Sequence, residues 1–198
     1  MRGFSTLILV GALLAAGSAR ASSVELFAKG SASKNHISRD NYTVNVSIAT
    51  GVGVTIVQGL RIEGRYTNNG SLQNRLDVNS GPASFILNDI KTSTTIYSLG
   101  FDLDLLGPKW MVQPFVYVGG GYVITERSYY VRPDEVTPAV FREEPKQTGI
   151  SGNLGVGFRV RLAKSLAFEA ELFAYGIDVH RPNPLVNLYG TIGIRIFL

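Results

Sequence analysis

Apolar residues, with glycine counted among them, occupy every second position over residues 186–198, the last stretch of the chain. The intervening positions are mixed and include Asn187, Thr191 and Arg195. A period of two predicts a β-strand with one apolar face and one mixed face. The predicted strand is about twice the usual length, which suits a tilted strand that crosses a bilayer. Because hydrocarbon does not tolerate an unpaired sheet edge, we expect this strand to close a ring with the first strand.

Strand-like patterns also cover most of the chain before it. The eight predicted strands are residues 24–33, 42–57, 60–68, 90–106, 111–130, 149–162, 166–178 and 186–198. Tight turns alternate with longer polar connections, the turns at 57–59, 107–109 and 163–165 and the connections at 34–41, 69–89, 131–148 and 179–185. Short turns at one end and long loops at the other are typical of bacterial outer-membrane barrels, and eight strands is the count at which side chains just fill the interior. The sequence therefore predicts an all-β fold, a membrane-spanning eight-stranded antiparallel up-and-down β-barrel.

Charged residues within these strands fall almost entirely on the face opposite the apolar one. We predict that they form a structural network of ion pairs in the lumen, whose members are Glu25, Arg61, Glu63, Arg65, Asp102, Asp104, Arg159, Arg161, Glu169, Glu171 and Arg195. Lys29 and Arg127 share the inward face. A charge that faces lipid at mid-depth costs about 2–4 kcal/mol, so this segregation is what a membrane barrel requires. Most members lie on the tight-turn side, and we expect them to block the periplasmic half of the lumen.

Counting pairs outward from the tight turns predicts which residues lie opposite one another. The turn at 57–59 places Gly51 opposite Arg65, and the turn at 163–165 places Arg159 opposite Glu169 and Gly157 opposite Glu171. Inward glycines opposite long charged side chains relieve crowding in a narrow barrel. The alternative is that these glycines are simple strand kinks.

The start of the chain has the layout of a secretory signal peptide. A short basic start is followed by the apolar run 4–16 and by Ala19-Arg20-Ala21, a small-x-small cleavage site. We expect residues 1–21 to be cleaved and residues 22–198 to form one outer-membrane barrel domain. Removing Arg2 and Arg20 leaves 17 basic residues against 15 acidic ones. That small excess, with no basic run, gives no support to a nucleic-acid partner.

The composition and the motifs of the chain give no sign of a catalytic, metal or cofactor site. The chain has no cysteine, so disulfides and thiolate metal sites are absent. Its glycines precede no Gly-Lys-Ser/Thr motif of a phosphate-binding loop. We therefore predict no cofactor, no metal and no catalytic residue.

Two segments resemble the OmpA-like family of small eight-stranded outer-membrane β-barrel domains. Residues 59–66 (Gly-Leu-Arg-Ile-Glu-Gly-Arg-Tyr) look like the third strand of that family, and residues 113–122 (Gln-Pro-Phe-Val-Tyr-Val-Gly-Gly-Gly-Tyr) look like its central strand. One departure is Leu198, which stands where the family usually has an aromatic residue. The resemblance implies a location in the bacterial outer membrane. Its implied partners are outer-membrane lipids, the barrel-assembly machinery and periplasmic chaperones.

The expected function is structural or surface interaction through the extracellular loops, with an unknown ligand. The long connections 69–89 and 131–148 are the candidate binding segments, because loops on a rigid scaffold carry most binding sites. A small-solute pore is one alternative. Another is an enzyme that modifies lipid A, since some small outer-membrane barrels use Ser and His for this purpose. The candidates here are His36 and His180, with Ser38 nearby in sequence. A Ser-His catalytic site is defined by the geometry of its side chains, and the sequence contains no additional motif of the lipid A enzymes.

Overall fold

The computed structural model describes residues 23–38, 41–80, 83–106, 110–133, 137–177 and 185–198. It contains strands only, namely β1 (Val24–Ser38), β2 (Asn41–Val57), β3 (Leu60–Ser80), β4 (Ala83–Asp104), β5 (Val112–Arg132), β6 (Val140–Glu143), β7 (Gln147–Ala163), β8 (Leu166–Ile177) and β9 (Leu185–Phe197). None of these residues forms a helix long and apolar enough to cross a membrane. The predicted signal peptide, residues 1–21, lies outside the described residues.

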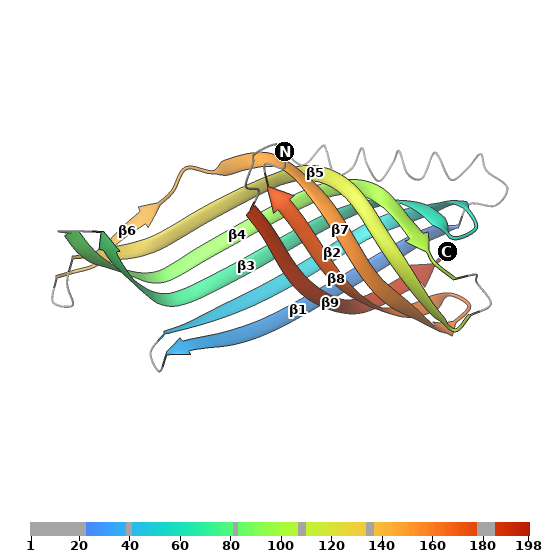
Figure 1. The fold of residues 1–198 in the computed structure, drawn as a ribbon, viewed down its shortest axis with the longest axis horizontal. Coiled ribbons are helices and arrows are strands. Elements are labelled where there is room, and N and C mark those ends of the chain that lie inside the picture. The colour runs from blue at the N-terminus through green and yellow to red at the C-terminus, as the bar shows by residue number, and fades with distance from the viewer. Residues whose placement is uncertain (1–22, 39–40, 81–82, 107–109, 134–136, 178–184) are drawn as a thin grey trace.

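Eight of the strands close into a ring (Figure 1). Each pairs antiparallel with its neighbour in the order β1, β2, β3, β4, β5, β7, β8, β9, and β9 pairs with β1. Following paired residues once around the ring leads from Ile196 on β9 to Val186 on the same strand, ten residues away. An eight-stranded barrel with this stagger has strands tilted by roughly 40°. The predicted all-β, eight-stranded antiparallel barrel is confirmed.

The tight turns set the register that the sequence predicts. Gly51 lies opposite Arg65, Arg159 lies opposite Glu169, and Gly157 lies opposite Glu171. Gly59 ends the first of these turns with a φ of 85°, a conformation that glycine adopts without strain. Because the side-chain period is two, a correct register also fixes which residues point inward.

Two predicted loops are wrong. Residues 34–41 and 69–89 were expected to be long polar loops, but β1 continues to Ser38, β3 continues to Ser80, and β4 begins at Ala83. The β3–β4 ladder runs almost without interruption from Leu60 opposite Leu103 to Ser80 opposite Ala83. Beyond the bilayer both faces of a strand meet water, so the hydrophobic alternation that marks a strand disappears while the backbone ladder continues.

The third long connection also contains a strand. Within residues 131–148, β6 pairs with the upper end of β5, from Ser128 opposite Glu143 to Val131 opposite Val140. β6 therefore continues the edge that β7 forms against the lower part of β5. Of the fourth connection, 179–185, residues 179–184 lie outside the described residues.

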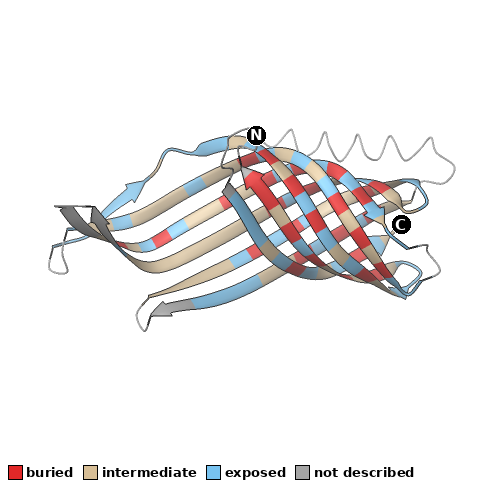
Figure 2. Ribbon diagram, viewed as in Figure 1, coloured by how far each residue is buried: buried red, intermediate tan, exposed pale blue. Residues whose placement is uncertain are grey.

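The outside of the ring is apolar, and the inside is charged and aromatic. Leu99, Leu188 and Trp110 are 64%, 63% and 61% exposed on the outer surface. The rings of Tyr66 and Tyr97 pack there at an interplanar angle of 56° with centroids 5.4 Å apart, next to Tyr122 in the same row of paired residues. Aromatic rows of this kind mark the membrane interface. Buried residues gather in the closed part of the ring, whereas the far ends of β3–β6 are mostly half-buried or exposed (Figure 2).

Candidate functional site

Arg195 on β9 lies at the centre of a buried ionic cluster in the lumen. Its Nη1 lies 3.0 Å from Glu25 Oε2, its Nη2 lies 2.8 Å from Glu63 Oε2, and its Nε lies 2.7 Å from Glu169 Oε2. The Arg195 side chain has no exposed surface. One guanidinium therefore joins carboxylates from three strands, β1, β3 and β8. Charge-assisted hydrogen bonds of this length are roughly twice as strong as bonds between neutral groups.

Two further arginines extend the cluster toward the tight turns. Arg61 Nε donates to Glu25 Oε1 at 2.7 Å, and its two other nitrogens donate to Asp102 at 3.0 Å and Asp104 at 2.6 Å. Arg159 Nε donates to Glu169 at 2.8 Å and Nη1 donates to Asp104 at 2.6 Å, while Nη2 contacts Asp102. Asp102 and Asp104 on β4 are thus shared between β3 and β7.

Arg65 and Lys29 continue the cluster toward mid-barrel. Arg65 Nη1 lies 2.7 Å from Glu171 Oε1, and Arg65 also contacts Glu63. Its guanidinium carbon lies 3.6 Å from the centroid of the Tyr117 ring, a close cation–π contact. Lys29 Nζ lies 2.6 Å from Glu171 Oε2 and also contacts Glu169. These contacts join the ionic cluster to the aromatic residues above it.

The cluster joins ten of the eleven residues that the sequence proposed, together with Lys29. Its six carboxylates and five cations are Glu25, Glu63, Asp102, Asp104, Glu169, Glu171, Lys29, Arg61, Arg65, Arg159 and Arg195. Arg161 is the exception, since it makes no ion pair with any residue the structure describes, and its guanidinium lies 5.1 Å from the Phe197 ring centroid. Arg127, which was also expected to point inward, has a partly exposed side chain and pairs instead with Glu144 at 3.4 Å.

An aromatic layer lies next to the ionic cluster and was not foreseen as a unit. Its buried members are Ile96, Tyr117, Val123, Phe173 and Tyr175, with Tyr189 packed against them. The Phe173 ring lies 6.0 Å from Tyr117 and 5.4 Å from Tyr189, centroid to centroid. The sequence contained the signal for this layer, because all six residues occupy inward positions in the two-residue alternation of their strands.

Space for these rings comes from the inward glycines. A Cβ added at Gly157 would lie 2.8 Å from the Phe115 ring, and one added at Gly51 would lie 2.5 Å from the Phe27 ring. Both positions face long charged residues across the ladder. The atom nearest to the added Cβ is a backbone carbonyl oxygen in both cases, closer still than the ring, so these glycines allow close backbone approach as well as bulky neighbours, and both interpretations of them remain open.

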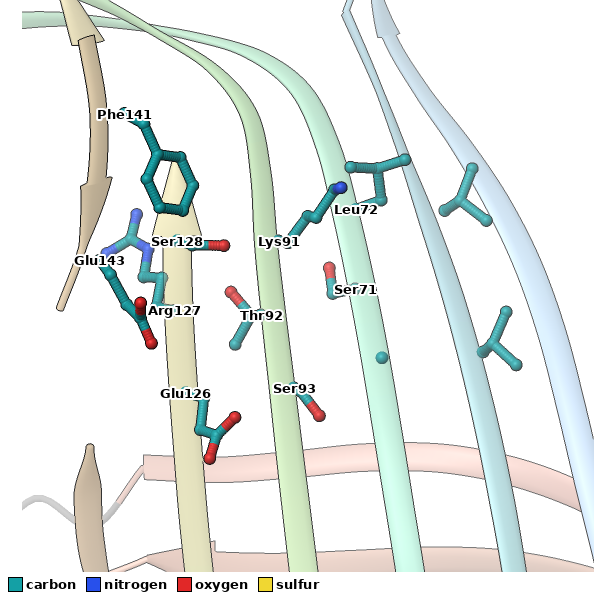
Figure 3. Close-up of a pocket in the computed structure, with 13 residues that line it drawn as sticks. Ser71, Leu72, Lys91, Thr92, Ser93, Glu126, Arg127, Ser128, Phe141 and Glu143 are labelled. Atoms are coloured by element: carbon teal, nitrogen blue, oxygen red, sulfur yellow. The ribbon is translucent and has the colours of Figure 1, made fainter. Parts of the chain in front are cut away.

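A pocket of about 450 Å³ lies on the outer surface beyond the row of Tyr66, Tyr97 and Tyr122 (Figure 3). Its lining comes from β2–β6 and comprises Val44, Val46, Gly70, Ser71, Leu72, Lys91, Thr92, Ser93, Glu126, Arg127, Ser128, Phe141 and Glu143. Phe141 is exposed, and its ring packs against the Tyr130 ring at an interplanar angle of 59° with centroids 5.4 Å apart. The pocket thus offers an aromatic ring, hydroxyl groups and charges of both signs.

The residues of the enzyme alternative are not brought together. His180 lies outside the described residues, while His36 and Ser38 lie at the end of β1 with undescribed side chains. Among the residues that the structure describes, no group of three or more His, Cys, Asp or Glu side chains could hold a metal ion.

No protein-family profile matches the chain, and no curated protein matches it in sequence. Solved structures do match. A major outer membrane protein from Thermus thermophilus has 13% identity, with 90% of this chain and 100% of that chain covered, at a TM-score of 0.52. The N-terminal β-barrel domain of Pseudomonas aeruginosa OprF has 14% identity, with 89% and 97% covered, at 0.43. Ail, the attachment invasion locus protein of Yersinia pestis, has 10% identity, with 89% and 97% covered, at 0.45.

At these identities the likeness shows a shared fold, and of the three only the Thermus protein exceeds a TM-score of 0.5. The geometry agrees with it, because eight antiparallel strands enclose buried charges and present an apolar belt outward. That combination is the architecture of bacterial outer-membrane barrels. The chain has the fold of a bacterial outer-membrane β-barrel, built here from eight antiparallel strands.

Proposed function

We propose that this protein is a sealed outer-membrane barrel that presents its extended sheet to ligands at the cell surface. The observation that carries the proposal is the continuation of β3, β4 and β5 as paired strands beyond the outward tyrosine row, with the pocket on their outer face. A rigid, exposed ladder with an aromatic and polar pocket suits recognition better than transport. Binding sites favour such concave surfaces with a few convergent polar groups.

The sealed lumen is supported by burial of the ionic cluster. Arg195, Arg159, Glu63 and Asp102 are at most 1% exposed although all four are ionisable. A water-filled pore would expose such side chains, as it does in wide barrels. The aromatic layer adds a second obstruction to the same passage. These contacts argue against the small-solute pore, and nothing in the described geometry favours the lipid A enzyme.

A planar-bilayer recording tests the seal. We expect refolded, heat-modifiable protein to give no steady current, because two packed layers occupy the lumen. The Arg65→Ala variant removes the cation that joins those layers and should give brief openings. A large and stable conductance from the wild-type protein would contradict the sealed barrel and favour a pore.

A binding screen tests the surface role. Protein in lipid nanodiscs is applied to arrays of glycans and of extracellular proteins, with Phe141→Ala as the pocket variant. Phe158→Ala is the matched control, because Phe158 is similarly exposed but lies on the lipid-facing wall. We expect a ligand that the wild type and the control bind and that Phe141→Ala binds at least ten-fold more weakly. Equal binding by both variants would remove the pocket from the proposal.

Lipid A mass spectra address the enzyme alternative. Expression of the protein in a bacterial host should leave the lipid A masses unchanged. A mass shift that disappears in His36→Ala or His180→Ala would replace the binding role with catalysis.

A further inference from the structure

The boundary between β1 and β9, here called the seam, is the shortest pairing in the ring. It runs only from Glu25 opposite Phe197 to Gly30 opposite Ile192. Beyond that point β1 continues to Ser38 paired with β2 alone, and β9 continues back to Leu185 paired with β8 alone. Figure 1 shows the far ends of the two strands well separated. The backbone ladder of the seam is therefore complete at the turn end and ends before the long-loop end, and the seam is called open in this sense.

The open part of β9 presents unpaired backbone groups. Leu198 N donates to Val24 O on β1 at 2.9 Å, whereas Phe197 N donates to Ser165 O on the β8 side at 3.0 Å. Successive residues of an antiparallel strand direct their N–H and C=O groups to alternate sides. Val186, Leu188 and Gly190 therefore direct these groups toward β1, yet none has a β1 partner among the described residues.

This edge lies in an apolar surface. The side chains of Val186 and Leu188 are 66% and 63% exposed on the outer, lipid-facing side. Unpaired backbone groups at membrane depth cost several kcal/mol each. Behind the edge, inside the barrel, the hydroxyl of Thr191 is buried and has no hydrogen-bond partner. Both observations point to a missing hydrogen-bonding neighbour at β9.

We propose that the open seam receives an extended strand from a partner polypeptide, which adds to the edge of β9. A lipid acyl chain cannot satisfy the backbone groups, whereas a β-strand satisfies them in alternation. The added strand carries apolar side chains beside Val186 and Leu188 and hydroxyl or amide side chains beside Thr191. It enters from the long-loop end, because six residue pairs close the seam at the turn end. Residues Leu185–Thr191 give it a contact of about 23 Å.

A second copy of the chain is a poorer occupant. Antiparallel pairing of two β9 edges relates the copies by a two-fold axis perpendicular to the sheet, which lies in the membrane plane. One barrel would then be inserted upside down relative to the other. The partner is therefore a different polypeptide, and a dimer becomes one of the outcomes that the tests below can detect.

Disulfide trapping tests whether the seam is open. The chain has no cysteine, so introduced pairs report without background. Ala28→Cys with Ile194→Cys is the control, because these residues are paired across the closed part. Ala32→Cys with Gly190→Cys is the test, since continuing the same register would place them opposite each other. Paired strand residues lie within disulfide range.

We expect the control pair to crosslink fully in oxidised, folded protein, and the test pair to crosslink at least ten-fold more slowly. Equal crosslinking of both pairs would mean that the seam closes on itself, which overturns the proposal. Mixing the two single variants Ala32→Cys and Gly190→Cys should give no crosslinked dimer. A dimer there would assign the edge to a second copy.

A peptide probe tests strand addition directly. A fluorescent seven-residue peptide of alternating valine and threonine is titrated into protein in nanodiscs, beside the same peptide N-methylated at its valines. Valines on the lipid side lie opposite Val186, Leu188 and Gly190, so methylation removes the N–H groups that face β9. We expect the methylated peptide to bind at least ten-fold more weakly. Equal binding, or no binding of either peptide, would overturn the proposal.

Discussion

Arg195 and Glu25 lie 170 residues apart in sequence and 3.0 Å apart in space. The contact joins the last strand of the barrel to the first, inside the closed part of the seam. Arg195 also holds Glu63 and Glu169, so its loss leaves three buried carboxylates short of a partner. The pairs are buried, where removing one partner is far costlier than at a surface.

Arg195→Met is therefore expected to lower the free energy of unfolding by about 3–5 kcal/mol. Arg161→Met is the matched control, because Arg161 lies near the same end of the barrel without an ion pair among the described residues. It should change stability by less than about 1 kcal/mol. Urea unfolding in lipid vesicles, followed by tryptophan fluorescence, measures both. A similar decrease in the free energy of unfolding in both variants would show that the ion pairs of Arg195 are not what stabilises the barrel.

Two neighbouring glycines should respond differently to a methyl group. A Cβ at Gly51 would lie 2.5 Å from Phe27 Cζ and closer still to the Gly64 carbonyl oxygen, whereas one at Gly53 has its nearest neighbour, Arg195 Nη1, at 3.4 Å. Gly51→Ala should cost about 1–3 kcal/mol through overpacking, and Gly53→Ala less than about 1 kcal/mol. The same unfolding assay checks the pair. An equal cost at both sites would contradict the packing described for Phe27.

The height of the hydrocarbon belt can be tested by introducing a single lysine at either of two heights on the outer surface. Leu99 is 64% exposed on the belt, and Leu72 lines the pocket beyond the tyrosine row. Leu99→Lys should cost about 2–4 kcal/mol in lipid vesicles, because the ammonium group faces hydrocarbon. Leu72→Lys should cost about 1 kcal/mol or less, because that position meets water and lipid head groups. A high cost at Leu72 would place the pocket within the membrane.

Hydrogen exchange tests the extension of β3 and β4. Amides of β3 from Asn69 to Gln73 pair with β2 or β4 and should exchange at least 100-fold more slowly than unprotected amides. Mass spectrometry on protein in nanodiscs gives the rates, with the exchange rates of unstructured peptides as the fast reference. Rapid exchange over residues 69–80 would contradict the extension of β3 and support the polar loop that the sequence predicted.

The membrane part of the fold was readable from the sequence because two strong constraints act there. Lipid forces an alternation of period two, and tight turns such as Val57-Gln58-Gly59 fix the register, so Arg159 opposite Glu169 followed by counting. Above the membrane the first constraint disappears. The segment that contains Asn69, Ser71 and Gln73 shows no alternation of apolar and polar residues, yet these residues still pair with β4. Sequence pattern alone cannot separate such a strand from a polar loop.

The ionic cluster was predictable as a set but not as a list of partners. Alternation places Arg161 inward beside Arg159, but only Arg159 reaches the carboxylates of β4 and β8. Partner choice depends on side-chain direction and depth within a narrow lumen, which a period of two does not encode. The pocket was missed for a similar reason, because it requires β6 and the upper ends of β2–β5 to lie on one surface.

The length of β3 has a consequence for what can approach this protein. Its 21 residues span roughly 70 Å along the strand, and a tilt of roughly 40° leaves about 50 Å along the membrane normal. The hydrocarbon belt takes up only about 25 Å of that height. The remaining height, about 25 Å, passes through the head-group layer and continues into water as a paired, stiff sheet. A folded protein or a long polysaccharide that approaches the cell therefore meets this extended sheet before it reaches the membrane surface.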